Sequence, residues 1–309
     1  MLTRATFRGP WAGLPVAWKD DMTFDEKTYR GDVARCCEAG VPGVYTGGTT
    51  GEFYAQDFDE FKRITDAAVR ECKRGKTPVM IGCTSTFTLG VVRRAQYARD
   101  RGADAIQVAL PFWMEVPDQE VVPFFKAVSK AVPGMPISIY ETRRAKKALT
   151  LQQHRRIHAA VPAVIGVKSN EATIGHEPAG CRALSRMMNV FVGENMWYKL
   201  GPHGAIGCCS SFVYQNPRVM LMVFGLLERK QWRELKLWMN KYDRLVYEGL
   251  TEMFEAGCAD SAIDRVLGLS AGFLKTSLAC RGPYPSCTPT HLRNFRAWLK
   301  KNLPELMEL

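Results

Sequence analysis

The sequence predicts an α/β protein, a (β/α)8 barrel with a C-terminal helical extension, and three observations support this fold class. Short apolar runs bounded by turn residues recur along the chain and have the length of strands buried on both faces. Amphipathic helical segments alternate with these runs, and Gly40, Gly102 and Gly204 each turn a helix into the next strand. Such alternation is typical of parallel strands joined by right-handed crossovers. The eight candidate strands are residues 14–18, 43–45, 78–83, 105–110, 136–140, 164–168, 190–192 and 205–209.

An open doubly wound sheet is the competing architecture. It is disfavoured because no Gly-x-Gly-x-x-Gly motif follows the first candidate strand, and because roughly 230 residues of repeated units is the length of a closed barrel. We therefore expect residues 1–228 to form the barrel with the active site. Beyond Gly225 the alternation stops, so we expect residues 229–309 to form a helical region packed on the barrel.

Several helices can be placed from their caps and apolar stripes. Asp57 is expected to cap a helix that buries Phe61, Ile64 and Ala68 and ends at Gly75. In the C-terminal region, Thr288 and Pro289 are expected to begin the last helix. A long helix before it has one apolar face, made by Trp232, Leu235, Met239 and Tyr242.

The composition is that of a globular protein, because 46% hydrophobic and 24% charged residues in a chain of 309 exclude disorder and fibres. We find no run of eighteen apolar residues and no export signal, so we expect a cytoplasmic protein with no membrane partner. The ten cysteines are scattered without a Cys-x-x-Cys motif and are expected to be reduced and mostly buried. No cysteine and histidine grouping has zinc spacing, and His154 and His158 fall on a helix expected to cover the outside of the barrel, so we expect no metal.

The formal net charge of +11 is the one feature that points to a nucleic-acid partner. The basic residues are interleaved with acidic ones and no nucleic-acid-binding motif is present, so we expect no such partner. A nucleic-acid or regulatory binding protein is the hypothesis from a different functional class.

Candidate reactive residues follow three of the strands, where barrel enzymes place their active sites. The second strand runs into Gly48-Thr49-Thr50-Gly51-Glu52, whose glycines allow a tight turn and whose hydroxyls and amides can hold a carboxylate. A Gly/Thr-rich turn of no special purpose is the alternative interpretation.

Lys168 ends the apolar run of residues 164–168, which is unusual because desolvating an ammonium group costs free energy. Burial of a lysine favours the neutral amine, which can attack a ketone and form a Schiff base. A lysine that bends out to solvent is the alternative. Tyr140, one strand along, can reach the same space and transfer protons, although a tyrosine at a strand end is more often part of the core.

Together, Gly48-Thr49-Thr50-Gly51-Glu52, Tyr140 and Gly166-Val167-Lys168 resemble the dihydrodipicolinate synthase/N-acetylneuraminate lyase family of class I Schiff-base aldolases. The similarity extends from Gly13 to the last helix and includes Gly204-Ala205-Ile206. A Gly-Thr-Thr-Gly-Glu loop followed about 120 residues later by a strand-final lysine is a specific combination.

The resemblance implies a pyruvate-type 2-keto acid bound as an imine to Lys168, with no other cofactor. Thr49 and Thr50 would hold its carboxylate, Tyr140 would move the proton, and Thr49 would belong to the catalytic group. Further substrate-binding positions carried over from the family are Gly48, Gly51 and Ile206. The protonated imine is an electron sink, so aldol addition, its reverse, or loss of a β-hydroxyl can follow. The family also implies a homo-oligomer, a tetramer or a dimer.

The chain departs from the synthases at several positions. Pro111-Phe112-Trp113 replaces Pro-Tyr-Tyr, and an indole cannot relay a proton as a phenol does. Glu141-Thr142-Arg143 replaces Asn-x-Pro after the tyrosine, and Ser169-Asn170 replaces the usual acidic residue after the lysine. Ala145 stands where an arginine of the synthases holds the second substrate, although it is surrounded by Arg143, Arg144, Lys146 and Lys147.

These departures argue against lysine biosynthesis and favour an aldolase or dehydratase for 2-keto-3-deoxy sugar acids or related hydroxy keto acids. Trp113, Arg143 and Arg144 are the candidates for binding the distal end of the substrate, and a solvated loop is the alternative for the basic run. Two other functions stay open, a dihydrodipicolinate synthase that condenses pyruvate with aspartate semialdehyde and a barrel that binds a keto acid without turnover.

Overall fold

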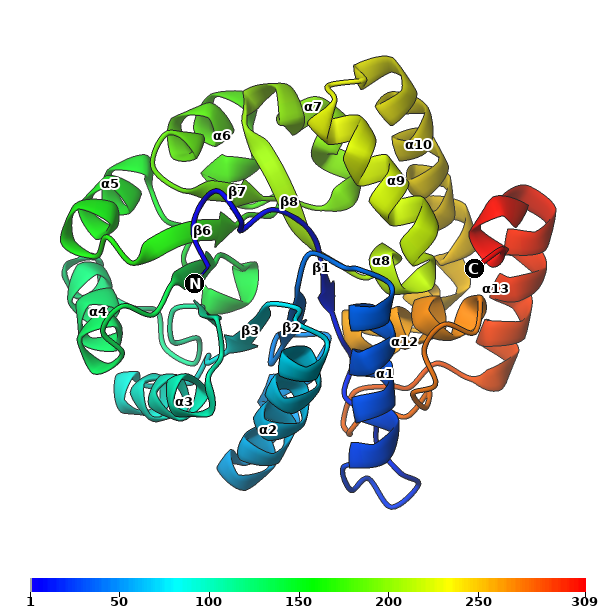
Figure 1. The fold of residues 1–309 in the computed structure, drawn as a ribbon, viewed down its shortest axis with the longest axis horizontal. Coiled ribbons are helices and arrows are strands. Elements are labelled where there is room, and N and C mark those ends of the chain that lie inside the picture. Colours follow the sequence, from blue (N-terminus) through cyan, green and yellow to red (C-terminus); the bar gives the residue numbers. More distant parts are fainter. Residues whose placement is uncertain (1) are drawn as a thin grey trace. The chain divides into compact units, whose positions relative to one another are not determined.

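The computed structural model describes residues 2–309 and has the predicted fold class, a closed barrel with the strand order β1-β2-β3-β4-β5-β6-β7-β8 (Figure 1). All strand pairings with a defined register are parallel, as the alternation with helices requires. The strands are β1 (Gly9–Gly13), β2 (Val44–Thr46), β3 (Val79–Gly82), β4 (Ala105–Val108), β5 (Ile137–Tyr140), β6 (Val164–Lys168), β7 (Asn189–Phe191) and β8 (Ala205–Ser210).

The first strand lies earlier than the sequence pattern predicted. Strand β1 is Gly9–Gly13, and residues 14–18 follow it as a loop. The prediction was wrong because both stretches are apolar and buried, with Leu14 at 0% and Trp18 at 2% exposure. Periodicity cannot separate a buried loop from a strand buried on both faces. The other seven predicted strands overlap the observed ones.

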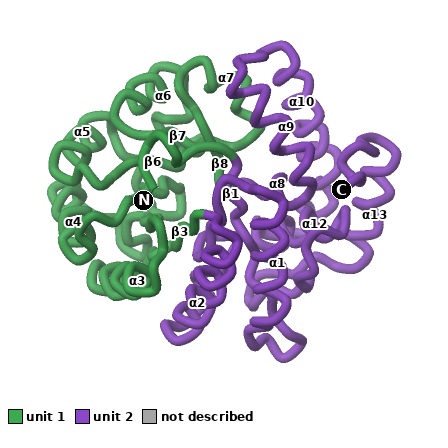
Figure 2. Tube along the Cα trace, viewed as in Figure 1, with its two compact units in different colours: residues 1–9, 78–209 green, residues 10–77, 210–309 purple. Residues whose placement is uncertain are grey.

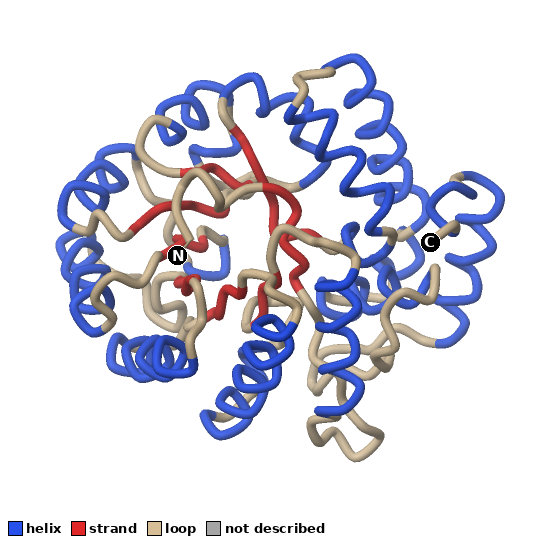
Figure 3. Tube along the Cα trace, in the orientation of Figure 1, coloured by secondary structure: helices blue, strands red, loops and turns tan. Residues whose placement is uncertain are grey.

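Helices alternate with the strands and continue after β8 (Figure 3). They are α1 (Glu26–Glu38), α2 (Phe58–Arg74), α3 (Thr88–Arg101), α4 (Asp118–Ala131), α5 (Leu151–Ala160), α6 (Pro178–Ser185), α7 (Trp197–Leu200), α8 (Phe212–Gln215), α9 (Pro217–Glu228), α10 (Trp232–Arg244), α11 (Thr251–Glu255), α12 (Asp260–Ser270) and α13 (Pro289–Asn302). Within residues 2–309, no helix is both long enough and apolar enough to cross a membrane.

The predicted helix caps are confirmed. The Asp57 carboxylate accepts a hydrogen bond from the Glu60 amide and forms a capping box at the start of α2. Gly102 ends α3 with a φ of 88°, a left-handed conformation that costs glycine little. Thr288 caps α13 in the same way, and its side chain accepts from the His291 amide.

The chain divides into two compact units (Figure 2). Unit 1 comprises the N-terminal segment up to Gly9 and Pro78–Cys209, and unit 2 comprises Pro10–Thr77 and Ser210–Leu309. In unit 1, helices α3, α4, α5 and α6 follow one another outside the strands β4 to β7 (Figure 1). Unit 2 contains the predicted C-terminal helical region together with the first two strands and helices. The boundary predicted between residues 228 and 229 separates the alternating strands and helices of the barrel from the C-terminal helices. The two units do not test this boundary, so it stays a prediction.

Candidate active site

Lys168 and Tyr140 lie side by side at the ends of paired strands in unit 1. The register of β5 and β6 sets Tyr140 directly opposite Lys168, and Lys168 Nζ lies 4.5 Å from the centre of the tyrosine ring. Lys168 is partly exposed and Tyr140 is 8% exposed, so both side chains lie against the protein and neither extends freely into solvent. Paired residues on neighbouring strands present their side chains on the same face, which explains why the two groups meet.

An apolar floor lies below Lys168, towards the amino end of its strand. Phe7 stacks on Phe191 with ring centroids 4.4 Å apart, and both side chains are fully buried. Gly166 makes room for this stack, because a Cβ atom there would come within 2.4 Å of the Phe7 ring. Asn189 holds the N-terminal segment by donating to the Phe7 carbonyl at 2.6 Å. Because Gly166 and Lys168 share one face of β6, the Phe7 ring lies on the face of the strand that carries Lys168, and Phe191 is the partner of Lys168 on β7.

Cys209, at the end of β8, is a third member of this group that the sequence analysis did not single out. The side-chain amide of Gln107 on β4 donates to Ser138 Oγ at 3.5 Å and to Cys209 Sγ at 3.7 Å. Burial raises the pKa of the Cys209 thiol, and the positive charge of Lys168 opposes that rise. The net shift is upward, so the thiol stays protonated and does not neutralise the lysine.

Glu141, the residue after Tyr140, is buried with a set of local partners. Its side chain is 3% exposed, and one carboxylate oxygen accepts from the Leu149 amide at 3.0 Å. The other oxygen lies 3.4 Å from His154 Nε2 and accepts from Ser169 Oγ at 3.5 Å. A buried carboxylate requires such partners, because an unpaired charge in the interior is costly.

The backbone of Glu141 joins the two strands that carry the candidate reactive groups. Its amide donates to the Lys168 carbonyl at 3.0 Å, and Asn170 Nδ2 donates to the Glu141 carbonyl at 3.1 Å. Glu141 and Ser169-Asn170 are the positions at which the chain departs from the family pattern, and here they bond to one another. His154 lies on α5 as predicted, but its side chain is fully buried beside Glu141. The spacing of His154 and Ile157 on one helical face was the signal for this burial.

The basic run after β5 is partly used in local contacts. Lys146 Nζ donates to the Trp113 carbonyl at 2.7 Å and lies 5.9 Å from the centre of its ring. Lys147 is paired with Asp118 at 2.7 Å and with Glu115 at 2.9 Å. These contacts join the basic run to the loop after β4, in which Trp113 is 73% exposed.

Arg143 and Arg144 lie in the single-turn helix η2 (Arg143–Ala145) and are both exposed. Arg143 Nε is 3.7 Å from a Glu171 oxygen, and both side chains of this pair are about two-thirds exposed at 67% and 64%. An ion pair in such a setting contributes little stability, so Arg143 is available to a ligand.

Ile206, another predicted substrate-binding residue, lies within β8. The register of β7 and β8 pairs Val190 with Ala205 and Phe191 with Gly207, so it skips Ile206 at a bulge. Its role at the site stays a prediction.

The loop after β2 belongs to unit 2 and is a tight turn, as predicted. Gly47 has a φ of 78°, and a Cβ atom at Gly48 would come within 2.4 Å of the Tyr45 hydroxyl. Thr49 is 9% exposed and Gly51 is buried. The Thr50 hydroxyl donates to Asp264 Oδ2 at 2.5 Å, so its proton is already engaged within unit 2. The Thr50 backbone amide is the group of this residue that suits a carboxylate ligand.

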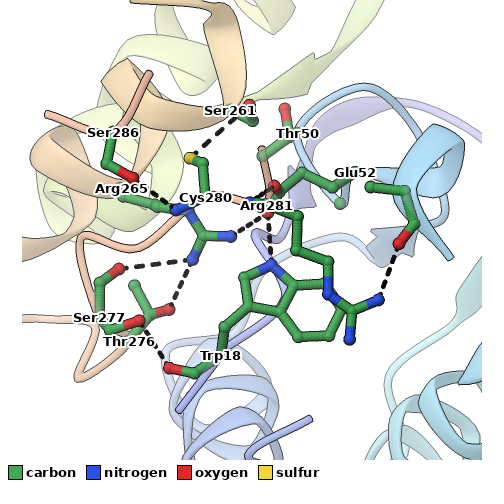
Figure 4. Close-up of polar contacts among 12 residues, drawn as sticks. Trp18, Thr50, Glu52, Ser261, Arg265, Thr276, Ser277, Cys280, Arg281 and Ser286 are labelled. Atoms are coloured by element: carbon green, nitrogen blue, oxygen red, sulfur yellow. Dashed lines mark hydrogen bonds and ion pairs between the residues drawn. The ribbon is translucent and has the colours of Figure 1, made fainter. Parts of the chain in front are cut away.

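Glu52, at the end of this loop, is the centre of a buried polar cluster (Figure 4). Glu52 and Arg265 of α12 are both 0% exposed, and an Arg265 Nη2 hydrogen donates to Glu52 Oε2. The Trp18 indole donates to the same oxygen at 2.7 Å, and the Arg281 amide donates to Oε1 at 2.8 Å. Glu52 also has a φ of 50°, which is strained for a residue with a side chain. The ion pair and its hydrogen bonds therefore hold the turn in its conformation.

The fold and these residues define a class of protein. A parallel barrel with a lysine and a tyrosine paired at strand ends, and a Gly-Thr-Thr-Gly-Glu loop after the second strand, is typical of class I aldolases and related lyases.

The chain belongs to the dihydrodipicolinate synthetase family, whose model matches residues 6–301, and it is a lyase of that family. A 4-hydroxy-tetrahydrodipicolinate synthase of Methylobacterium radiotolerans is 31% identical over 221 residues, which are 71% of this chain and 72% of the relative. The fold is similar to that of YagE from E. coli K12 in complex with pyruvate, with a TM-score of 0.84, 18% identity and coverage of 96% and 98% of the two chains. It is also similar to CdNal from Clostridium difficile in complex with mannosamine, with a TM-score of 0.84, 21% identity and coverage of 96% and 99%.

The buried pair of Glu52 and Arg265 leads to a stability prediction. Glu52→Gln keeps the shape but leaves the Arg265 guanidinium buried without a counter-charge, so we expect the free energy of unfolding to fall by about 3–5 kcal/mol. Chemical denaturation followed by circular dichroism measures this change. The control is Glu248→Gln in the helical turn that follows α10, because the Arg244–Glu248 pair is half exposed, at 48% for each side chain, and its loss should leave stability unchanged. Equal effects of the two substitutions would contradict the importance of the buried pair.

Proposed function

We propose that this chain is a Schiff-base lyase that binds pyruvate or a 2-keto-3-deoxy acid as an imine on Lys168. The observation that supports this most directly is the placement of Lys168 Nζ 4.5 Å from the centre of the Tyr140 ring, above an apolar floor. A lysine attacks a ketone through its neutral amine, and Tyr140 lies beside this amine as a group that can exchange protons with it. Membership of the dihydrodipicolinate synthetase family and the pyruvate complex of the structurally similar YagE agree with this proposal.

In the proposed reaction, the neutral Lys168 amine attacks the ketone carbon and forms a carbon–nitrogen bond. The departing oxygen takes one proton from the attacking nitrogen and one from Tyr140 and leaves as water, and a protonated imine results. The imine withdraws electrons from the neighbouring carbon–carbon or carbon–hydrogen bond. Aldol cleavage, condensation or loss of a β-hydroxyl can then proceed through the enamine, and water finally releases the keto acid and restores the amine.

The substrate carboxylate is assigned to the loop after β2. In a parallel barrel the carboxyl ends of the strands meet at one end, and the active site lies there. The Thr50 hydroxyl donates to Asp264, so for Thr50 we assign the backbone amide to the carboxylate. The hydroxyl and amide of Thr49 are assigned to it as the family resemblance implies. Gly48 and Gly51 allow the backbone of this loop to approach the ligand closely.

The distal end of the substrate is assigned to Arg143 and Arg144, with Trp113 at the rim. Both arginines have exposed side chains after β5, where the family resemblance places the distal end of the substrate. Guanidinium groups bind carboxylates and phosphates in a bidentate manner, which suits a sugar acid with an anionic end. Trp113 offers an apolar face, and its indole cannot relay a proton.

Dihydrodipicolinate synthase is the second candidate activity, and the relative from Methylobacterium radiotolerans is named a 4-hydroxy-tetrahydrodipicolinate synthase. Ala145 and Trp113 stand against it, because neither supplies the guanidinium or the phenol expected of a synthase. A barrel that binds a keto acid without turnover is the third candidate. A homo-oligomeric state stays a prediction from the family resemblance, and a cytoplasmic location stays a prediction from the sequence.

Reduction with borohydride in the presence of pyruvate tests the covalent step. We expect the adduct on the peptide that contains Lys168, because reduction converts the imine to a stable secondary amine. Peptide mass mapping locates the adduct. Lys168→Ala should abolish it, whereas the control Lys126→Ala, at an exposed lysine on α4, should retain it. An adduct on another lysine, or none, would overturn the mechanism.

Tyr140→Phe separates proton transfer from capture of the keto acid. The variant keeps the ring that faces Lys168 but lacks the hydroxyl, so we expect turnover to fall roughly 10²-fold or more while pyruvate is still trapped by borohydride. Steady-state kinetics and the trapping yield measure the two effects. Turnover equal to that of the wild type would remove Tyr140 from the reaction.

A substrate screen distinguishes the candidate activities. We expect cleavage or dehydration of 2-keto-3-deoxy acids, followed by release of pyruvate or of the dehydrated keto acid, and slow reaction of pyruvate with aspartate semialdehyde. Arg143→Ala together with Arg144→Ala should raise KM for substrates with a distal anion more than for neutral ones, because only the former lose an ionic contact. Rapid condensation with the semialdehyde would establish the synthase instead, and trapping without turnover of any substrate would favour the binding protein.

A further inference from the structure

Two cysteines and a histidine gather in unit 2, outside the site described above. Cys258 follows α11, Cys287 precedes the cap of α13, and His291 lies in the first turn of α13. One ligand atom from each residue lies within 4.8 Å of the other two. Cys258 is 8% and Cys287 3% exposed, and the His291 side chain is 13% exposed. The keto-acid chemistry proposed above uses none of the three.

The surroundings of this cluster add a fourth group of suitable chemistry. An oxygen of the Glu252 carboxylate on α11 lies 4.0 Å from His291 Nε2. Asn294 donates to both Glu252 oxygens, at 3.3 and 3.0 Å, and holds the carboxylate at this position. Cys280 is nearby in the chain but is directed elsewhere, because its thiol lies 3.9 Å from Ser261 Oγ.

We propose that Cys258, Cys287 and His291 bind a zinc ion, with Glu252 as the fourth ligand. Zinc prefers four ligands in a tetrahedron, with bonds of about 2.3 Å to sulfur and about 2.0–2.1 Å to nitrogen, so ligand atoms of one ion lie about 3.4–3.8 Å apart. The cluster therefore needs a contraction of no more than about 1.4 Å between any two of its three atoms to reach this geometry. Two thiolates and an imidazole favour zinc over calcium or magnesium, which prefer oxygen ligands.

Metal binding would set the protonation states of the ligands. On binding, both thiols lose their protons to solvent and the two thiolates balance the charge of Zn²⁺. His291 Nδ1 accepts from the Thr288 amide at 3.2 Å, so binding through Nε2 moves the ring proton to Nδ1 and replaces this hydrogen bond. The other bond of the cap, from the His291 amide to Thr288 Oγ1 at 3.1 Å, is retained.

The consequence of such a site is a cross-link in the C-terminal region. It would join the turn after α11 to the start of α13, and 28 residues lie between Cys258 and Cys287 in the sequence. A metal that binds only the folded state stabilises it. The spacing of the ligands is unlike that of common zinc motifs, which explains why the sequence analysis found no grouping.

Metal titration of the full-length chain tests the proposal. The protein is purified with a phosphine reductant, which leaves zinc free to exchange, and titrated first with Co²⁺ and then with Zn²⁺. We expect one Co²⁺ per chain with a thiolate charge-transfer band and the visible spectrum of a tetrahedral site, stoichiometric displacement by Zn²⁺, and a rise in Tm on zinc binding. A spectrum without thiolate bands, or a Tm that does not change, would overturn the proposal.

Variants locate the site. Cys258→Ser, Cys287→Ser and His291→Ala should each weaken Zn²⁺ binding by about 10²-fold or more, because each removes one of the ligands that zinc prefers. Cys280→Ser is the matched control, since it removes a buried thiol from the same segment and should bind normally. Circular dichroism shows whether each variant is folded. Unchanged binding in the ligand variants, equal loss in the Cys280→Ser control, or a Cys258–Cys287 disulfide that persists in the reductant would each contradict a zinc site.

Discussion

The pairing of β5 with β6 is the constraint on which the candidate active site depends. Its register sets Tyr140 against Lys168, and the parallel arrangement brings both residues to the carboxyl ends of their strands. A slip of one residue in either strand would turn its reactive side chain to the opposite face. The stack of Phe7 on Phe191, with Gly166 opposite, fills the space beneath the lysine and holds β6 and β7 in place. The position of the amine is therefore a consequence of backbone hydrogen bonds and of close packing.

Two buried glutamates, one in each unit, hold loops in similar ways. Glu141 joins the segments that follow β5 and β6, with His154, Ser169 and the Leu149 amide as its partners. Glu52 joins the loop after β2 to Arg265, Trp18 and the backbone of Arg281. Each carboxylate is removed from water, and each is compensated by several donors or by a counter-charge. Buried charges of this kind fix the conformation of a loop, because any other arrangement leaves them unpaired.

The departures from the family pattern occur at two places. One is the pair of segments that follow β5 and β6, and the other is the surroundings of Trp113. The acidic residue that usually follows the lysine is absent, and the acidic residue after the tyrosine, Glu141, bonds to Ser169 and Asn170 instead. The negative charge therefore follows β5 in this chain, whereas the family usually has it after β6. Around Trp113 the departures involve the basic segment after β5. Lys146 donates to the Trp113 carbonyl and Lys147 pairs with Asp118, while the side chains of Arg143 and Arg144 are exposed. These contacts change the residues that border the proposed site, whereas Lys168 and Tyr140 are kept.

The sequence by itself determined the fold class, seven of the strands, the caps of α2 and α13, and the identity of the family, because these depend on local periodicity, capping chemistry and short motifs. The tertiary structure alone decided that Phe7 closes the floor below Lys168, that His154 faces Glu141, that the Thr50 hydroxyl is committed to Asp264, and that Cys258 lies beside Cys287 and His291. Most of these contacts join residues that are far apart in the chain. Which distant side chains meet depends on how the whole core packs, and that information is not present in the spacing of any one segment.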